Sequence, residues 1–186
     1  MAIDDLVQDA TRRMDKSVEA AQQEFATLRT GRATPALLDR IQIDYYGQQT
    51  PLKQLATINA PEPRMLTIQP FDPTSVGTIE RAIQESDLGL TPSNDGKLIR
   101  LPIPQLTEER RKELVKVVRN MAEEGRVAVR NVRRDVMHHL KELVDKGEAG
   151  KDEEHRAEER VQKLTDEHTT KIDELLQRKE AEILEV

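Results

Sequence analysis

All nine prolines of this chain lie within residues 31–104, and their distribution constrains the fold more than any other feature. Proline breaks helices and central strands, so this segment can hold only short elements. The stretches before and after it contain no proline and can form long, uninterrupted helices. The chain therefore combines two kinds of structure, with the prolines at Pro35, Pro51, Pro61, Pro63, Pro70, Pro73, Pro92, Pro102 and Pro104.

Three long helices are predicted outside the proline-rich segment. Residues 3–28 carry apolar side chains at intervals of three and four, which is typical of a helix with one buried face. We expect this helix to end near Thr30 and Gly31, because glycine suits a helix end. A second helix should run from Thr107, a good N-cap, to Lys146. A third should begin at 152–154, with an inner face formed by Val161, Leu164, Ile172, Leu175 and Ile183.

Each of these helices has an apolar stripe that needs a partner. An elongated antiparallel three-helix bundle would satisfy all three stripes. A dimeric coiled coil is the alternative, but the short connection at 147–151 favours helices that fold back on each other.

The proline-rich segment shows short alternating runs typical of strands, at residues 40–45, 55–58, 65–68 and 98–101. One helix fits residues 73–86. We therefore expect an α+β fold in which residues 1–30 and 105–186 form the bundle and residues 31–104 form an inserted small α/β domain. The chain crosses between the domains twice, which predicts a hinge at Thr30, Gly31, Arg32, Pro104 and Gln105. A fixed angle between the domains is the alternative.

Composition excludes several classes of function. The chain has no cysteine, so disulfides and cysteine chemistry are excluded. No stretch is typical of a membrane span or a signal peptide, and we expect a cytoplasmic protein with no membrane partner. The few aromatic residues argue against RNA binding by base stacking; they are Phe25, Phe71, Tyr45 and Tyr46.

Positive charge gathers on the second helix, although the chain carries a net charge of −6. Residues 107–146 hold 11 Lys/Arg against 8 Asp/Glu. At about 100° per residue, five arginines share one arc of about 100° and form a row about 33 Å long. No acidic residue of this helix falls inside the arc between Arg111 and Arg133. The row consists of Arg111, Arg119, Arg126, Arg130 and Arg133, interleaved with Val115, Ala122 and Val129.

A separate face of the same helix is expected to pack on the bundle, through Leu114, Val118, Met121, Ala128, Val132 and Val136. The arginine row could engage a phosphate backbone at several points, because guanidinium groups make paired hydrogen bonds to phosphate oxygens. A solvated helix face with no ligand is the alternative.

Several long motifs, in order along nearly the whole chain, resemble the bacterial ribosome recycling factor family. They include LRTGRA at residues 28–33, LTEERRK at 106–112 and RVAVRNVRRD at 126–135. Shorter matches are MDK at 14–16, YYG at 45–47, TPL at 50–52, SDLGL at 86–90 and VQKLTD at 161–166.

The resemblance implies an L-shaped, two-domain protein that binds the large ribosomal subunit, and its 23S rRNA, after termination. With elongation factor G and GTP, such proteins split the ribosome into subunits. It implies rRNA contacts by Arg130 and Arg133, supported by Arg29, Arg111, Arg119 and Arg126, with Asn131 and Arg134 as flanking contacts. For Arg29 and Arg32, electrostatic capping of the first helix is an alternative.

The family mechanism assigns GTP hydrolysis to the partner. The pair Gly96-Lys97 lacks the glycine spacing and the Ser/Thr of a phosphate loop. We expect a monomer without cofactor, metal or catalytic residues. If the hinge operates, Gly31→Pro should slow splitting and leave ribosome binding intact.

Other candidate sites are weak. His138 and Glu142 lie four apart on a helix, but no third metal ligand has a clear spacing. His168 falls on an inner helix face, where packing is favoured over catalysis. Of Tyr45 and Tyr46, one should pack and the other be exposed, because neighbours in a strand point to opposite faces. A structural adaptor and a chaperone of free RNA remain rival functions.

Overall fold

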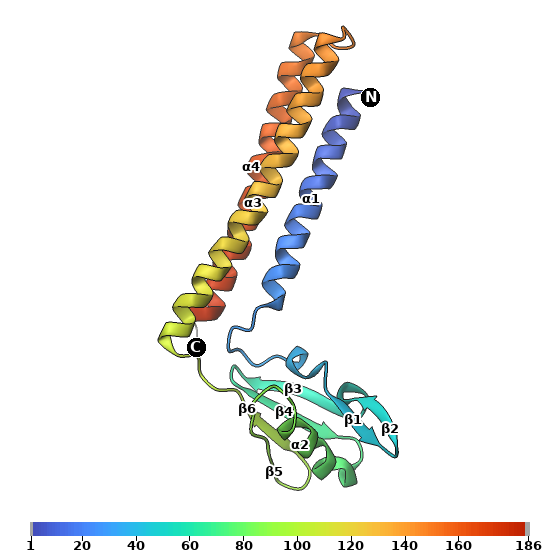
Figure 1. Ribbon diagram of the computed structural model, residues 1–186, viewed down its shortest axis with the longest axis vertical. Coiled ribbons are helices and arrows are strands. Elements are labelled where there is room, and N and C mark those ends of the chain that lie inside the picture. Colours follow the sequence, from blue (N-terminus) through green and yellow to red (C-terminus); the bar gives the residue numbers. More distant parts are fainter. Residues whose placement is uncertain (1, 185–186) are drawn as a thin grey trace. The chain divides into compact units, whose positions relative to one another are not determined.

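Long helices and short strands separate into two units in the computed structural model, which describes residues 2–184 (Figure 1). One unit contains residues 2–29 and 109–184, and the other is Thr30–Glu108. The boundaries between the units thus lie after Arg29 and after Glu108, whereas the sequence analysis placed them after residues 30 and 104.

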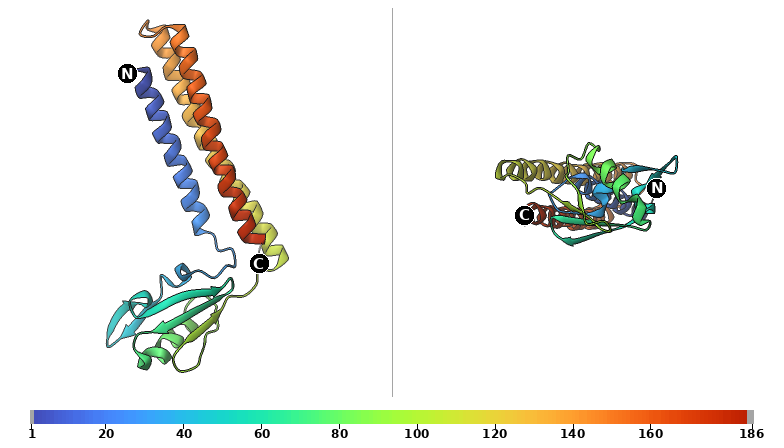
Figure 2. Two further views of the ribbon diagram at one scale, coloured as in Figure 1. Left: turned by 180° about the vertical axis from the view of Figure 1, so that it is seen from behind. Right: turned by 90° about the horizontal axis from the view of Figure 1, so that it is seen from below.

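The helical unit consists of α1 (Ile3–Thr27), α3 (Glu108–Asp145) and α4 (Lys151–Leu184). The bounds of α1 and α3 agree with the predicted ranges 3–28 and 107–146 to within one residue, and α4 begins just before the predicted start at 152–154. The three helices lie side by side along their lengths, and α3 runs opposite to the other two (Figures 1 and 2). The three helices of this one chain therefore form an antiparallel bundle, as predicted.

Glycine ends α3 in a well-defined cap. Gly147 adopts a φ of +73°, and its N–H donates to the carbonyl of Val144 at 3.0 Å. The N–H of Glu148 donates to the carbonyl of Leu143 at 2.9 Å. These two bonds form a Schellman motif, which satisfies carbonyl groups at the helix end and reverses the chain toward α4.

The three helices pack closely at Gly125. A Cβ atom at this position would lie 3.2 Å from Cδ1 of Ile172 and 3.3 Å from Cβ of Ala21. All three helices meet here, and a side chain at this position would force its neighbours on α1 and α4 to shift. The buried face of α3 consists of Leu114, Val118, Ala122, Gly125, Val129, Val132, Val136 and Leu140.

This face corrects part of the sequence analysis. Ala122 and Val129, assigned to the arginine arc, are buried in the core. Met121 and Ala128, assigned to the packing face, are only partly buried. The arginine row therefore borders the core directly. The buried face of α3 lies closer to the arginines than helical periodicity indicated.

The Thr30–Glu108 unit contains a hairpin and a four-stranded antiparallel sheet. The hairpin pairs β1 (Gln42–Tyr45) with β2 (Gln48–Pro51). The sheet has the order β3-β4-β6-β5, with β3 at Ala56–Glu62, β4 at Met65–Pro70, β6 at Ile99–Pro102 and β5 at Ser93–Asn94. The strands β2 and β5 were not predicted, since both are short and polar.

One helix covers this sheet, as expected from residues 73–86. A short 3₁₀ turn, η3 (Pro73–Ser75), leads into α2 (Val76–Gln84). Ile79 and Ile83 of α2 are fully buried in the same core as Leu66 and Ile68 of β4. Leu66 pairs with Leu101 and Ile68 with Ile99, so these four side chains form a continuous apolar layer.

Both chain crossings are bonded to the turn between β3 and β4. The N–H of Ala33 donates to the carbonyl of Pro63 at 2.7 Å, and that of Ile103 to the carbonyl of Arg64 at 2.8 Å. The two crossings also approach each other, because a Cβ on Gly31 would lie 2.8 Å from Cγ of Leu106.

Gly31 does not cap α1, which corrects a prediction. The helix ends at Thr27, and Leu28 is already extended. Gly31 has a φ of +78°, which a proline ring cannot adopt because it fixes φ near −65°. Gly31→Pro would therefore distort the crossing and is not a clean way to stiffen a hinge.

Among residues 2–184, no helix has the length and apolarity needed to cross a bilayer.

Candidate nucleic-acid interface

Three arginines of the predicted row line an open groove between α3 and α4. The groove has a volume of about 540 Å³. From α3 it receives Arg126, Arg130 and Arg133 together with Glu123, and from α4 it receives Gln162, Thr165, Asp166, Thr169 and Asp173. More than half of the lining residues therefore come from α4, which the sequence analysis did not connect with the arginine row.

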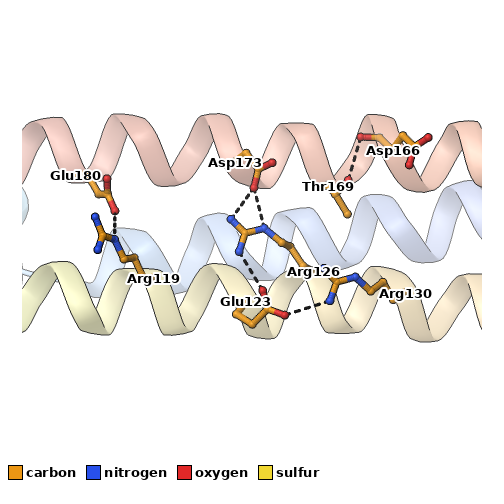
Figure 3. A network of polar contacts seen from close by, with 8 residues as sticks. All are labelled: Arg119, Glu123, Arg126, Arg130, Asp166, Thr169, Asp173 and Glu180. Carbon is orange, nitrogen blue, oxygen red and sulfur yellow. Dashed lines mark hydrogen bonds and ion pairs between the residues drawn. The ribbon is translucent and has the colours of Figure 1, made fainter.

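Arg126 is held by carboxylates on two sides (Figure 3). Its Nε and Nη2 lie 2.7 Å and 2.6 Å from Oδ1 of Asp173 on α4. Its Nη1 lies 3.1 Å from Oε2 of Glu123, one turn earlier on α3. All three guanidinium nitrogens are thus engaged, and the side chain is only 21% exposed.

Glu123 links Arg126 to Arg130. Its second oxygen, Oε1, accepts from Nη1 of Arg130 at 3.1 Å. Hydrogen bonds from Arg126 and then from Arg130 lower the pKa of the Glu123 carboxyl below its ordinary value. Asp173, Arg126, Glu123 and Arg130 therefore form a chain of alternating charges across the groove (Figure 3).

Arg119 and Arg133, on either side of Arg126 and Arg130 in the row, differ in the charge of their partners. Arg119 donates through Nε to Oε1 of Glu180 on α4 at 2.7 Å (Figure 3). Arg133 instead donates through Nη1 to the neutral amide oxygen of Gln162 at 2.9 Å. The bond from Arg133 leaves its charge uncompensated, whereas Arg119 and Arg126 bond to carboxylates.

These contacts change how the arginine row is understood. On α3 alone the arc contains no acidic residue, and Glu123 lies just outside it. In the folded bundle, Asp173 and Glu180 of α4 face the same arc and pair with its arginines. Helical periodicity could not reveal them, because it describes one helix and not its neighbour.

The remaining predicted contact residues lie outside this groove. Arg111 is half-buried, and Arg29, Asn131 and Arg134 are exposed. Asn131 and Arg134 follow Arg130 and Arg133 along the same helix, so they lie beside the row.

The structure also places the weaker candidate residues. His138 and Glu142 form a pair at 3.0 Å, and no group of three potential metal ligands occurs within residues 2–184. His168 is buried and bonded. Tyr45 is half-buried and its hydroxyl donates to Asp72, whereas Tyr46 is 83% exposed.

Comparison with known proteins gives a consistent result. The family model described as "Ribosome recycling factor" matches residues 21–184. The ribosome-recycling factor of Rubrobacter xylanophilus is 62% identical over 178 residues, covering 96% of each chain. That of Bacillus subtilis is 58% identical over 174 residues, covering 94% of each.

Solved structures agree. A solution structure of the ribosome recycling factor is 44% identical, with a TM-score of 0.74 over 100% of this chain and 99% of its own. A second match is described as models for the T. thermophilus ribosome recycling factor and the E. coli elongation factor G bound to the E. coli post-termination complex. It is 49% identical, with a TM-score of 0.64 over 99% of this chain and 100% of its own. The full-length similarity to these relatives, on the same combination of long helices and a small sheet, shows that the chain belongs to the ribosome recycling factor family.

Proposed function

We propose that this protein is a translation factor that binds the ribosome after termination and, with elongation factor G and GTP, separates it into subunits. This frees mRNA and tRNA for another round of translation. One observation carries the proposal: a relative 49% identical over 99% of this chain is described in a post-termination complex together with elongation factor G.

The proposed ribosome contact is the arginine row, and the partner is 23S rRNA of the large subunit. Arg130 and Arg133 are the principal contacts. Arg130 shares one carboxylate with Arg126, and Arg133 has a neutral partner, so both retain positive charge for phosphate oxygens. Arg134 and Asn131 flank them on α3, and Arg29, Arg111, Arg119 and Arg126 are supporting contacts.

The two crossings are proposed to act as a hinge through Thr30, Gly31, Arg32, Pro104 and Gln105. Elongation factor G would push the inserted unit while the bundle stays on rRNA, and the resulting rotation would disrupt contacts between the subunits. The elongation factor would hydrolyse GTP, so the proposed role needs no cofactor or catalytic group in this chain. We propose that it acts as a monomer in the cytoplasm, where ribosomes translate.

Light scattering tests both the function and the anchor. Post-termination ribosomes from a matched source are mixed with elongation factor G, GTP and the protein, and dissociation lowers the scattering. The wild type should produce a fall, and Arg133→Ala should produce little or none. Arg156→Ala, which removes an exposed arginine of α4 outside the groove, is the matched control and should behave as the wild type.

The outcomes separate the parts of the proposal. A fall with both wild type and Arg133→Ala would keep the function and move the anchor elsewhere. If the wild type gives no fall, the proposed function is wrong. Equally tight binding to free RNA and to ribosomes would then favour an RNA chaperone.

A further inference from the structure

The groove that carries the proposed rRNA contacts is balanced in charge. Its three arginines face three carboxylates, Glu123, Asp166 and Asp173. A surface built only to attract phosphate would leave such arginines uncompensated. The carboxylates must therefore be included in any account of how RNA is bound here.

Arg126 makes more contacts with carboxylate oxygens than Arg130 or Arg133 does. Its Nε, Nη1 and Nη2 all contact carboxylate oxygens, at distances of 2.6–3.1 Å. A phosphate that binds a guanidinium in the paired geometry needs two of these nitrogens. The Nε–Nη2 edge of Arg126 is taken by Asp173, so an RNA phosphate can pair with that edge only by displacing this carboxylate (Figure 3).

The same arrangement recurs two turns away. Glu180 accepts from Nε of Arg119, and this carboxylate is less exposed than the arginine it holds. The row is therefore blocked by acidic residues at Arg119 and Arg126, and it is open at Arg133, where the partner is the amide of Gln162.

We propose that Glu123 and Asp173 determine specificity by acting as an intramolecular competitor for RNA phosphate. In the free protein they occupy Arg126 and part of Arg130 and cancel the field that would attract any RNA. A phosphate backbone gains these arginines only when it displaces the carboxylates. The ribosome can offset the free-energy cost of displacing the carboxylates through its other contacts with the protein, whereas free RNA contacts only the groove.

The inference rests on the proposed function, because it concerns which RNA the groove accepts. It also has a measurable signature of its own. Each additional phosphate that is neutralised makes log K fall more steeply with log salt, by about 0.9 for duplex DNA, and we expect a similar increment for duplex RNA. Removing the competing carboxylates should therefore change the salt dependence as well as the affinity.

The test is binding of a short fluorescein-labelled RNA duplex, measured by fluorescence anisotropy over a series of salt concentrations. The double variant Glu123→Gln/Asp173→Asn keeps the shape of both side chains and removes both charges. We expect it to bind naked duplex about tenfold more tightly than the wild type, with a salt slope steeper by about one.

The chain offers a matched control in the adjacent residues. Glu124→Gln/Glu174→Gln makes the same change in net charge at exposed positions of the same two helices. It should bind naked duplex within about twofold of the wild type, with an unchanged slope. Circular dichroism melting checks that both variants fold.

Two results would overturn the inference. The first is an equal gain in duplex affinity for the control variant, which would mean that the effect comes only from the change in net charge. The second is weaker binding by Glu123→Gln/Asp173→Asn, which would mean that the carboxylates support the arginines. Binding of wild type to isolated large subunits, measured in parallel, tests the proposed function separately and can fail without affecting the duplex comparison.

Discussion

The Nε2 atom of His168 lies 2.7 Å from Oδ1 of Asp15, so a buried imidazole of α4 is bonded to a carboxylate of α1. The Nδ1 atom of the same ring lies 2.6 Å from the carbonyl oxygen of Leu164. The ring is thus held by one oxygen of its own helix and by one oxygen of the neighbouring helix α1. His168 ties two helices together at a position that is 2% exposed.

Replacing His168 by alanine should destabilise the bundle by about 2–4 kcal/mol, because it opens a cavity and removes both bonds. Thermal unfolding followed by circular dichroism measures the change. His155→Ala, at an exposed position of the same helix, should cost less than about 0.5 kcal/mol. Equal losses of stability in the two variants would show that the buried, bonded His168 stabilises the bundle no more than an exposed histidine does.

Acid should weaken the contact between α1 and α3. Nη1 of Arg13 lies 2.5 Å from Oδ2 of Asp135, and this hydrogen bond lowers the pKa of the Asp135 carboxyl below 3.8. The stabilisation is therefore complete above pH 3.8 and is lost as the pH falls through the lowered pKa. At neutral pH, Asp135→Asn should cost at most about 1 kcal/mol, since the pair is partly exposed.

Urea unfolding of wild type and Asp135→Asn at several pH values tests this expectation. The difference between them should shrink as the pH falls below 3.8. In an Arg13→Gln background the difference should be much smaller, because only the weaker charge interactions of Asp135 with His139 and His138 remain. A difference that stays constant with pH would mean that Asp135 acts through something other than its charge.

Helical glycines should differ sharply in their tolerance of a side chain. Gly125→Leu should destabilise the bundle by about 3 kcal/mol, because its side chain would overlap Ala21 and Ile172. Gly77 lies in α2 with open space around its Cβ position, and Gly77→Leu should cost less than about 1 kcal/mol. Thermal melting compares the two, and a tolerated Gly125→Leu would contradict the packing at this point.

The close approach of Gly31 and Leu106 predicts a coupled pair. Gly31→Ala should cost about 1–2 kcal/mol for the positive φ, in addition to the overlap with the leucine. Shortening the leucine relieves the overlap, so Gly31→Ala/Leu106→Ala should cost about 1 kcal/mol less than the sum of the single changes.

Tyrosine fluorescence during urea unfolding reports on this pair. The chain has no tryptophan, and its two tyrosines, Tyr45 and Tyr46, both lie in the Thr30–Glu108 unit. Additive effects of the two substitutions would mean that the side chain at residue 31 does not meet Leu106.

Salt dependence of binding should identify Arg130 as a phosphate contact. Arg130→Ala should weaken binding to large subunits and reduce the slope of log K against log salt by about one. Arg12→Ala removes an arginine of α1 and should leave the slope unchanged. An unchanged slope for Arg130→Ala would remove this residue from the interface.

The long helices were predictable because their sequences are periodic and free of proline over many turns. The strands β2 and β5 were not, because Gln48–Pro51 and Ser93–Asn94 contain no alternation of apolar and polar residues. They form strands because neighbouring segments offer backbone partners, which is a tertiary cause.

The arginine row shows a different limit. The sequence placed Arg126 and Arg130 on one side of a helix, and the structure agrees. It could not place Asp173 beside Arg126, 47 positions away, because that contact depends on how α4 is rotated against α3. Similarly, the sequence indicated Gly31 as a residue that follows a helix. Its positive φ and the closeness of Leu106 to its Cβ position are the structural reasons for a glycine here.

The bonds of Ala33 and Ile103 to the adjacent carbonyls of Pro63 and Arg64 also bear on the entropy cost of forming the bundle. An unfolded insertion would be a long loop between α1 and α3, and closing it would cost the bundle entropy. Once the insertion has folded, its entry and exit segments are fixed at one hairpin turn, and the loop becomes a short connector. A folded insertion would therefore serve as an internal template that holds the bundle's two separated segments close together.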